Sequence, residues 1–243
     1  MRQFDVLVWG AQADSNSKPH EPPFTDKALG WFFGNDLNAS LAKSEAEWIV
    51  IAHESVVVDR DFLNNLAECI SGYPMVDAFA PRIKSHESKS FISGYQLNRH
   101  TGLSMLDENA KMRFVATPFP YIAAFSRRIV QRTGALDTFL PTELQIADLS
   151  LRMLHAGGRM FSIPYLVAES TNDVSISINI LQSPRELAYT LTKAFGVLKN
   201  LPYLARHPKA TYFIWKVRKE LFEKRDKATL LSKFKKSDFA GLS

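Results

Sequence analysis

Short apolar runs alternate along this chain with longer segments whose apolar residues recur at helical spacing. Residues 4–10, 47–52, 76–81 and 159–167 are the clearest short runs. They are too short for buried helices, and their β-branched and aromatic residues are typical of buried strands. Strands that alternate with helices predict an α/β fold, in which helices flank a mostly parallel mixed sheet.

Several longer segments carry the spacing of amphipathic helices. They cover residues 26–43, 61–70, 127–134, 145–156, 184–200 and 210–236. Gly157 and Gly158 follow the helix predicted at 145–156 and indicate its C-terminal end. Residues 114–125 are strand-like but contain Pro118 and Pro120. The polar residues 86–111 are expected to form a loop or a hairpin that covers the site.

The length of the chain limits its domain organisation, and its cysteine content indicates its compartment. A chain of 243 residues fits one large domain with an appendage. We place the domain at residues 1–180 and a helical extension at 181–243. Cys69 is the single cysteine, so no internal disulfide forms, which is typical of a reducing compartment. No segment resembles a signal-peptide core or a membrane span, and we expect a cytoplasmic protein.

The positive charge of the chain is concentrated near its C-terminus. The formal net charge is +5, and residues 206–236 hold eleven Lys or Arg against three acidic residues. Aromatic residues such as Trp215 lie among these cations. The segment is either a solvated helix face or a surface that lies on an anionic membrane, which would make the protein peripheral to that membrane. No nucleic-acid-binding motif accompanies the charge.

Two predicted strands end in polar or small residues that would lie together. Trp9, Gly10 and Ala11 stand at the end of the first strand, and His53, Glu54 and Ser55 follow the second. Ligands of parallel α/β sheets bind outside the carboxyl ends of the strands. We therefore predict a binding site at this edge of the sheet.

Three segments, taken in order, resemble the family 2 glycosyltransferases of the GT-A fold. The first is 38–51, in which Asn38 precedes a small-residue helix end and a strand. The second is 122–128 together with 134–137, which is similar to the family's stretch of small residues, Arg-Arg, a helix and Gly-Gly-Phe-Asp. The third is 145–152 with 156–159, which is similar to Glu-Asp-x-Asp-Leu-x-Leu-Arg followed by Ala-Gly-Tyr-Arg.

The resemblance implies a GT-A-like fold that binds a nucleotide sugar, with uridine diphosphate and Mn²⁺ or Mg²⁺. It also implies transfer of the sugar to an acceptor, whether glycan, lipid or protein. The chain departs from the family at two motifs. His53 and Ser55 stand where the metal motif has aspartates, and Gln145 and Ile146 stand where the family has Glu-Asp. There is also room for only one strand before Asn38, where the family has two.

The cation and donor sites are assigned residue by residue from this resemblance. Glu54 with His53 is the candidate metal site, and Glu169 is a further candidate ligand, because hard oxygen donors suit both cations and Mn²⁺ also accepts imidazole. Glu54 is alternatively a surface residue at a strand end. The candidate donor-binding residues are Trp9, Gly10, Ala11, Asp14, Asn38, His53 and Ser55. Two of them have ordinary alternatives: a turn for Asp14 and core packing for Trp9.

The acceptor hydroxyl must lose its proton in an inverting transfer, and a carboxylate does this. Asp148 matches the later Asp of the family motif, and Glu143 lies two residues before the motif. Asp148 alternatively pairs with Arg152 one turn later in its own helix. Because the motifs are altered, two other functions stay open. One is a binding protein that has lost turnover, and the other is a membrane adaptor that uses the basic C-terminal segment.

Overall fold

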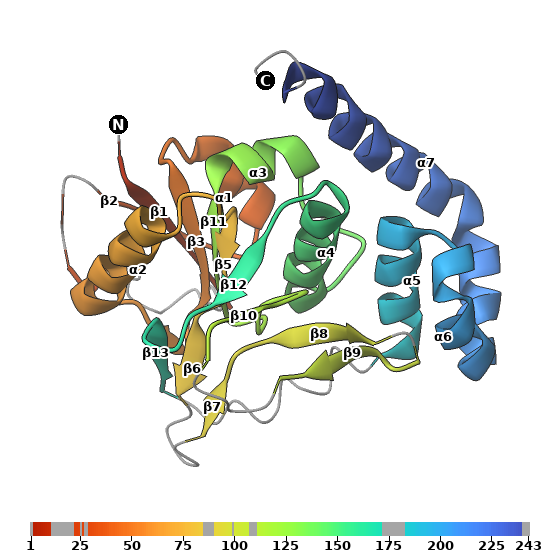
Figure 1. Ribbon diagram of the computed structural model, residues 1–243, viewed down its shortest axis with the longest axis horizontal. Helices are drawn as coiled ribbons and strands as arrows, with labels where there is room; N and C mark the ends of the chain where they lie inside the picture. The colour runs from red at the N-terminus through yellow and green to blue at the C-terminus, as the bar shows by residue number, and fades with distance from the viewer. Residues whose placement is uncertain are drawn as a thin grey trace, which may run out of the picture.

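The computed structural model describes residues 2–10, 22–24, 26, 29–84, 90–98, 100–106, 111–171 and 183–239, with side chains up to residue 227. Figure 1 shows a central sheet that runs through the molecule, a hairpin below it, and a group of C-terminal helices to one side. The two ends of the described chain lie on the same side in this view.

Within the described residues the central sheet has seven strands, in the order β10-β12-β5-β11-β3-β1-β2. β1 pairs in parallel with β2 and with β3, and β5 pairs in parallel with β12. β11 runs antiparallel to both β3 and β5, and β10 is antiparallel to β12. The predicted α/β class with a mostly parallel mixed sheet is confirmed. The bounds are β1 Phe4–Trp9, β2 Leu29–Phe33, β3 Trp48–His53, β5 Ala78–Phe79, β10 Arg113–Phe114, β11 Ile122–Ser126 and β12 Met160–Ser162.

A second, smaller sheet lies at the end of the first. Its described order is β4-β13-β6-β7, formed by β4 Val56–Val57, β6 Arg82–Lys84, β7 Phe91–Ile92 and β13 Val167–Ser170. The run at 159–167 is thus divided between two sheets, because Pro164 lies in the turn between β12 and β13. β8 Tyr95–Asn98 and β9 Gly102–Met105 form an antiparallel hairpin, which confirms the hairpin alternative predicted for the polar segment.

Helices cover both faces of the central sheet. Alternate residues of β1 and β3 belong to two different apolar clusters, with Val6 and Val50 in one and Leu7 and Ile51 in the other. This is the period-two alternation of a sheet that is buried on both faces. The helices are α1 Leu37–Lys43, α2 Arg60–Gly72, α3 Arg127–Thr133, α4 Thr142–His155, α5 Pro184–Phe195, α6 Leu201–Arg206 and α7 Pro208–Phe239, with a 3₁₀ turn, η2, at Leu198–Asn200.

The C-terminal helices share a core with the sheet. α5 packs on α4, and the long α7 contacts both α5 and α3. Leu187, Tyr189 and Ile214 of these helices belong to the same apolar cluster as Val6 and Val50 of the sheet. Among the described residues, no helix is long and apolar enough to cross a membrane.

The prediction of a helix over residues 26–43 is wrong for the first half of that segment. Residues 29–33 form the edge strand β2, and the helix α1 begins only at Leu37. Trp31 to Phe33 are aromatic residues that favour strands, and the next residues turn the chain, since Gly34 has a φ of 146°. The Asp36 side chain then accepts a hydrogen bond from the Ala39 N–H and caps α1. Two strands therefore precede Asn38, where the sequence indicated room for one.

Candidate functional site

The carboxyl ends of β1 and β3 meet at one edge of the sheet, as predicted. The two strands pair in register up to Trp9 and His53, which are Cα partners. The Glu54 N–H donates to the carbonyl of Trp9 over 2.8 Å, which joins the two strand ends one residue further. Ala11 and Asp14, two of the predicted donor-binding residues, lie outside the described residues.

His53 is enclosed by aromatic side chains at this edge. Its ring stacks on Tyr121, with centroids 4.3 Å apart and planes 12° apart, and meets the edge of Trp9 at 4.5 Å. Burial lowers the pKa of His53 to about 4, so the imidazole is neutral near pH 7. The Ser55 N–H donates to Nδ1 over 3.1 Å, and Nδ1 is therefore an acceptor. The neutral ring carries its proton on Nε2.

Gly10 allows the backbone to pass close to this imidazole. It has a φ of 91°, and a Cβ at this position would lie 2.5 Å from Nε2 of His53. The Gly10 N–H donates to Oδ1 of Asn35 over 3.0 Å, which links the end of β1 to the residues after β2. Trp9 is buried, and its indole N–H has no hydrogen-bond partner among the described residues.

Ser55 connects the end of β3 to the second sheet. The residue is buried, and its carbonyl accepts hydrogen bonds from the N–H and the hydroxyl of Thr171 at 2.8 and 3.1 Å. The Ser55 hydroxyl lies 2.7 Å from Nδ1 of His53. Ser55 therefore fixes the imidazole, whereas the neighbouring Glu54 side chain is exposed to solvent.

The predicted metal ligands do not gather into one cluster in the part of the chain that is described. No group of three or more His, Cys, Asp or Glu side chains there is arranged to hold a cation. Glu169 is exposed and forms an ion pair with Lys84 over 2.8 Å, and Nδ1 of His53 is engaged with Ser55. The described side chains at this edge therefore do not form a metal site by themselves.

Asn38 holds two segments of the protein together. Its side-chain amide donates to the carbonyl of Leu136 over 3.0 Å, and its oxygen accepts from the Leu136 N–H over 2.9 Å. These paired bonds join α1 to the connection between α3 and α4. The donor-binding role predicted for Asn38 stays a prediction. The observed partner of the Asn38 side chain is the backbone of Leu136.

Asp148 is fully buried in α4. Its Oδ2 accepts from Arg152 Nε over 2.8 Å and from Lys193 Nζ over 2.9 Å. This pairing with Arg152 is the alternative role that the sequence predicts for Asp148, and it is confirmed. Ile146 is buried in the apolar core, and Gln145 donates to the carbonyl of Leu140. Glu143, in the first turn of α4, is partly exposed.

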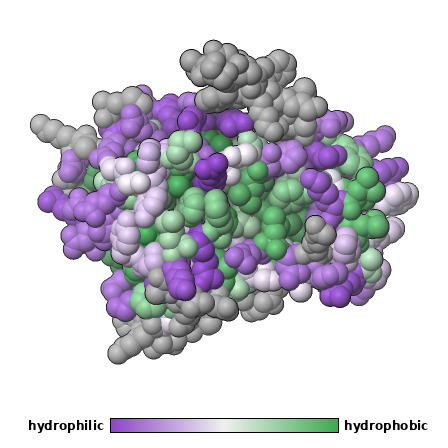
Figure 2. All heavy atoms as spheres, viewed as in Figure 1, coloured by the Kyte–Doolittle hydropathy of each residue, from purple (hydrophilic) through white to green (hydrophobic). Residues whose placement is uncertain are grey.

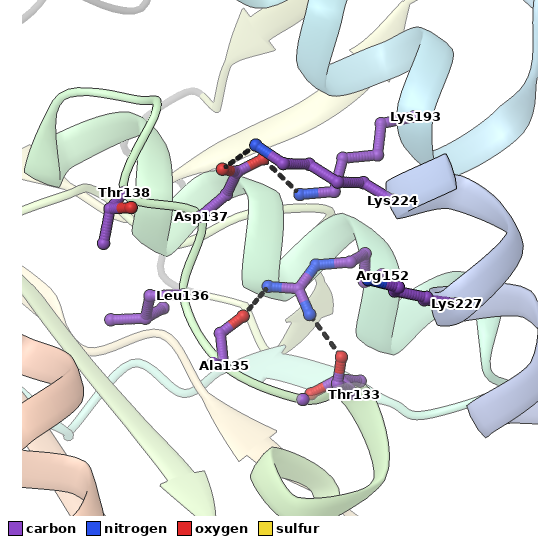
Figure 3. Close-up of a pocket in the computed structure, with 10 residues that line it drawn as sticks. Thr133, Ala135, Leu136, Asp137, Thr138, Arg152, Lys193, Lys224 and Lys227 are labelled. Atoms are coloured by element: carbon purple, nitrogen blue, oxygen red, sulfur yellow. Dashed lines mark hydrogen bonds and ion pairs between the residues drawn. The ribbon is translucent and has the colours of Figure 1, made fainter. Parts of the chain in front are cut away.

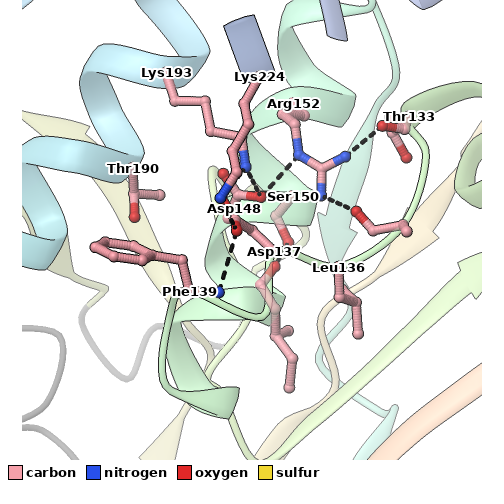
Figure 4. Close-up of polar contacts among 12 residues, drawn as sticks. Thr133, Leu136, Asp137, Phe139, Asp148, Ser150, Arg152, Thr190, Lys193 and Lys224 are labelled. Atoms are coloured by element: carbon pink, nitrogen blue, oxygen red, sulfur yellow. Dashed lines mark hydrogen bonds and ion pairs between the residues drawn. The ribbon is translucent and has the colours of Figure 1, made fainter. Parts of the chain in front are cut away.

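A buried ionic network connects α4, α5 and α7, and sequence spacing alone does not reveal it. Asp137 accepts from Lys193 and Lys224 over 2.8 Å each and from the Tyr189 hydroxyl over 3.0 Å. Burial alone would raise the pKa of Asp137, but the two lysines outweigh burial and hold the pKa well below its usual range. Figure 4 shows Lys193 of α5 and Lys224 of α7 beside Asp137, which lies in the connection between α3 and α4. Asp137 belongs to the motif at 134–137, but its side-chain partners are 52 to 87 residues away.

The sequence matches no protein-family model, and it matches no curated protein sequence. A solved structure does share its fold. A crystal structure of GalNAc-T7 with UDP, GalNAc and Mn²⁺ superposes with a TM-score of 0.57 at 10% identity, over 93% of this chain and 54% of that chain. This chain therefore spans about half the length of that protein.

Two further solved structures are similar over most of the chain. A mannosyltransferase from Pyrobaculum calidifontis in complex with GDP-Man and Mn²⁺ has a TM-score of 0.47 at 14% identity, covering 100% of this chain and 81% of that one. TarS from S. aureus, residues 1–349, has a TM-score of 0.46 at 13% identity, covering 84% and 71%. The sheet order, the helices and the GalNAc-T7 superposition together show that this chain has a GT-A-like fold.

Proposed function

We propose that this protein is a glycosyltransferase that binds a nucleotide sugar at the carboxyl edge of β1 and β3. The observation that carries the proposal is the arrangement of Trp9, Gly10 and His53 at that edge. Ligands of α/β sheets bind at this position. The GalNAc-T7 structure of the same fold holds UDP, GalNAc and Mn²⁺, and by analogy we propose a uridine diphosphate sugar as the donor.

Each residue of the edge has a role in this proposal. Gly10 has no Cβ, which lets the end of β1 lie directly against the His53 imidazole. The neutral His53 is held in one orientation by Tyr121 and Ser55. A bound Mn²⁺ or Mg²⁺ would neutralise the charge of the diphosphate leaving group. Glu54 would contribute its exposed carboxylate to that cation.

We assign the general base to Glu143. A base must reach the acceptor hydroxyl, and Asp148 is enclosed with Arg152 and Lys193. Glu143 is partly exposed in the first turn of α4. Glu143→Gln is expected to lower the turnover of sugar transfer by about 10²–10⁴-fold, with little change in the affinity for the donor.

A nucleotide-sugar-binding protein without turnover is the second candidate. The observation in its favour is Ile146, an apolar and fully buried residue at the position where the family has an acidic one. This candidate predicts donor binding with no release of uridine diphosphate from any sugar donor. The two candidates therefore separate in one assay, which follows nucleotide release from a panel of UDP-sugars.

The first experiment is a calorimetric titration with uridine diphosphate, in the presence and absence of Mn²⁺. The variants are wild type, Glu54→Ala and, as the matched control, Glu68→Ala, which removes an exposed carboxylate on α2. Metal-dependent binding that is lost only in Glu54→Ala supports the donor site. Absence of binding under every condition would refute the uridine nucleotide assignment.

We also propose that the exposed aromatic side chains at the start of α7 lie on an anionic membrane that presents the acceptor. Tyr212 and Trp215 are 66% and 59% exposed, and the Arg218 guanidinium lies 4.7 Å from the Trp215 ring. Figure 2 shows hydrophobic and hydrophilic side chains mixed at the end of the molecule where α6 and α7 begin. Aromatic residues among cations favour an anionic lipid interface.

Co-sedimentation with vesicles that contain phosphatidylserine tests this surface. Trp215→Ala is expected to weaken the binding, and higher salt should weaken it further. Met75→Ala is the control, because Met75 is also exposed but lies in the turn after α2. Equal binding of both variants would exclude α7 as the contact.

A further inference from the structure

A pocket of about 340 Å³ lies between the α3–α4 connection, α5 and α7. Its volume is within the usual range of small-molecule sites, roughly 300–1,000 Å³. Figure 3 shows its lining residues. The donor-site candidates Trp9, His53 and Glu54 are not among them. The lining combines residues 133–138 with Arg152 of α4, Lys193 of α5, and Lys224 and Lys227 of α7.

Cations dominate the lining of this pocket. Four of its residues are Lys or Arg, against the single carboxylate of Asp137. A smaller, adjoining pocket shares Arg152 and Lys193 and adds Arg132 to the lining. Arg132 Nε is buried and has no hydrogen-bond partner among the described residues. The combined lining therefore carries five cationic side chains.

The acidic groups that face these cations do not balance them. Asp137 and Asp148 share Lys193, and Lys224 bridges Asp137 and the half-exposed Glu220. Three carboxylates thus stand against five cations. Lys227 is exposed and makes no hydrogen bond or ion pair with a described residue. The excess charge lies on Lys227 and Arg132, at the parts of the lining that the carboxylates do not reach.

The fixed geometry of Arg152 suits this pocket to an anion with several oxygen atoms. Its guanidinium donates to Asp148 and to the carbonyls of Thr133 and Ala135, as Figure 3 shows in part. A guanidinium has five N–H groups, so two of them are not used by these bonds. The Thr138 side chain adds a hydroxyl to the lining. Arg and Lys in such an arrangement recognise phosphate oxygens.

We propose that this pocket binds the phosphate group of a small anionic ligand, at a site separate from the nucleotide-sugar site. The group is either part of a soluble phosphate compound or a lipid headgroup, and both present the same oxygens to Arg152 and Lys227 in the pocket, with Arg132 in the adjoining one. Because α7 supplies Lys224 and Lys227, the bound anion also fixes the C-terminal helix against the domain. A ligand here would therefore stabilise the docked position of α7.

Calorimetric titration of the full chain with inorganic pyrophosphate tests the proposal. Wild type is expected to bind. Lys227→Ala and Arg132→Ala should each weaken the binding by roughly tenfold, as expected for the loss of one charge-assisted hydrogen bond. Lys216→Ala is the matched control, because it removes an exposed α7 lysine that does not line the pocket. It should bind as wild type does.

Two outcomes would overturn the proposal. One is the absence of wild-type binding both to pyrophosphate and to vesicles that contain phosphatidic acid, and the other is binding in both arms that is the same for wild type, Lys227→Ala and Arg132→Ala. Vesicles that contain phosphatidic acid form a parallel arm. If Lys227→Ala weakens binding to vesicles but not to pyrophosphate, the ligand is a lipid headgroup. If Lys227→Ala weakens binding to pyrophosphate, the pocket accepts a soluble phosphate.

The result is independent of the sugar-transfer proposal. Glu54→Ala alters the proposed nucleotide-sugar site, and it should leave pyrophosphate binding at this pocket unchanged. Failure of uridine diphosphate to bind, together with a pyrophosphate response that depends on Lys227, would remove the transferase proposal and leave the anion pocket in place.

Discussion

The ammonium group of Lys193 lies 2.9 Å from Oδ2 of Asp148, and this contact joins α5 to α4 inside the protein. Both side chains are almost completely buried, at 5% and 0% exposure. Charged groups in such a position are stable only when they are paired, because removal from water costs several kcal/mol per ion. The relationship gives Asp148 a structural role and explains how the C-terminal helices are attached to the sheet domain.

Replacing Asp148 tests this structural role. Asp148→Asn leaves Lys193 and Arg152 with one fewer buried counter-charge, so the free energy of unfolding is expected to fall by about 3–5 kcal/mol. Urea denaturation followed by circular dichroism measures the change. Glu143→Gln, at a partly exposed position of the same helix, should change stability by less than about 0.5 kcal/mol. Unchanged stability in Asp148→Asn would show that its contacts with Arg152 and Lys193 do not hold α4 and α5 together.

The paired hydrogen bonds between Asn38 and Leu136 provide a second test. Asn38→Ala removes both bonds and leaves the Leu136 N–H and carbonyl without these partners, which is expected to cost about 1–3 kcal/mol of stability. Donor affinity, measured at a temperature where the variant is folded, should stay unchanged. A large loss of nucleotide affinity with normal stability would return Asn38 to the donor site.

The close approach of Gly10 to His53 predicts a difference between two glycines. Gly10 and Gly157 both have a positive φ, 91° and 83°, so alanine is strained at either position by roughly 1–2 kcal/mol. Only at Gly10 would the new Cβ also meet a side chain, His53 Nε2 at 2.5 Å, while at Gly157 nothing lies within 4 Å.

Gly10→Ala should therefore destabilise the protein more than Gly157→Ala, and it should also displace His53 and weaken nucleotide binding. Thermal unfolding and the uridine diphosphate titration measure the two effects. Equal stabilities and equal affinities of the two variants would show that the contact with His53 has no energetic consequence.

The sequence predicts the central strands and their meeting edge well, because buried strands have a local signature. The runs at 4–10 and 47–52 are apolar apart from Asp5 and Glu47, and they form β1 and β3 with Trp9 beside His53. The edge strand β2 has no such signature. Its residues, half-buried in the structure, share the apolar spacing of the helix that follows, and only the turn at Gly34 and the Asp36 cap separate the two.

The ionic network at Asp137 could not be predicted in the same way. Lys193 and Lys224 are two of many lysines in helical segments, and nothing in their local sequence separates them from solvated residues. Their burial depends on how α5 and α7 dock, which is a tertiary property. The local pair of Asp148 and Arg152 was predictable as an alternative because its spacing is one helical turn.

The lowered pKa of His53 predicts how stability depends on pH. Burial lowers the pKa from 6.5 to about 4, so between these values the unfolded chain binds a proton that the folded protein does not. Stability is therefore lost as the pH falls below 6.5, and the loss from pH 7 to pH 5 is roughly 1–2 kcal/mol. Below about pH 4 both states are protonated, and His53 adds no further change.

His53→Asn is the matched variant for this prediction, because an amide oxygen can replace Nδ1 as the acceptor for the Ser55 N–H and does not titrate. Urea denaturation at pH 7 and pH 5 should show a larger decrease in the free energy of unfolding for wild type than for His53→Asn. An identical decrease in the two proteins would mean that the folded His53 takes up its proton as readily as the unfolded one. The imidazole would then be accessible to water. The inference that Trp9 and Tyr121 enclose it and keep it neutral at the proposed donor site would be wrong.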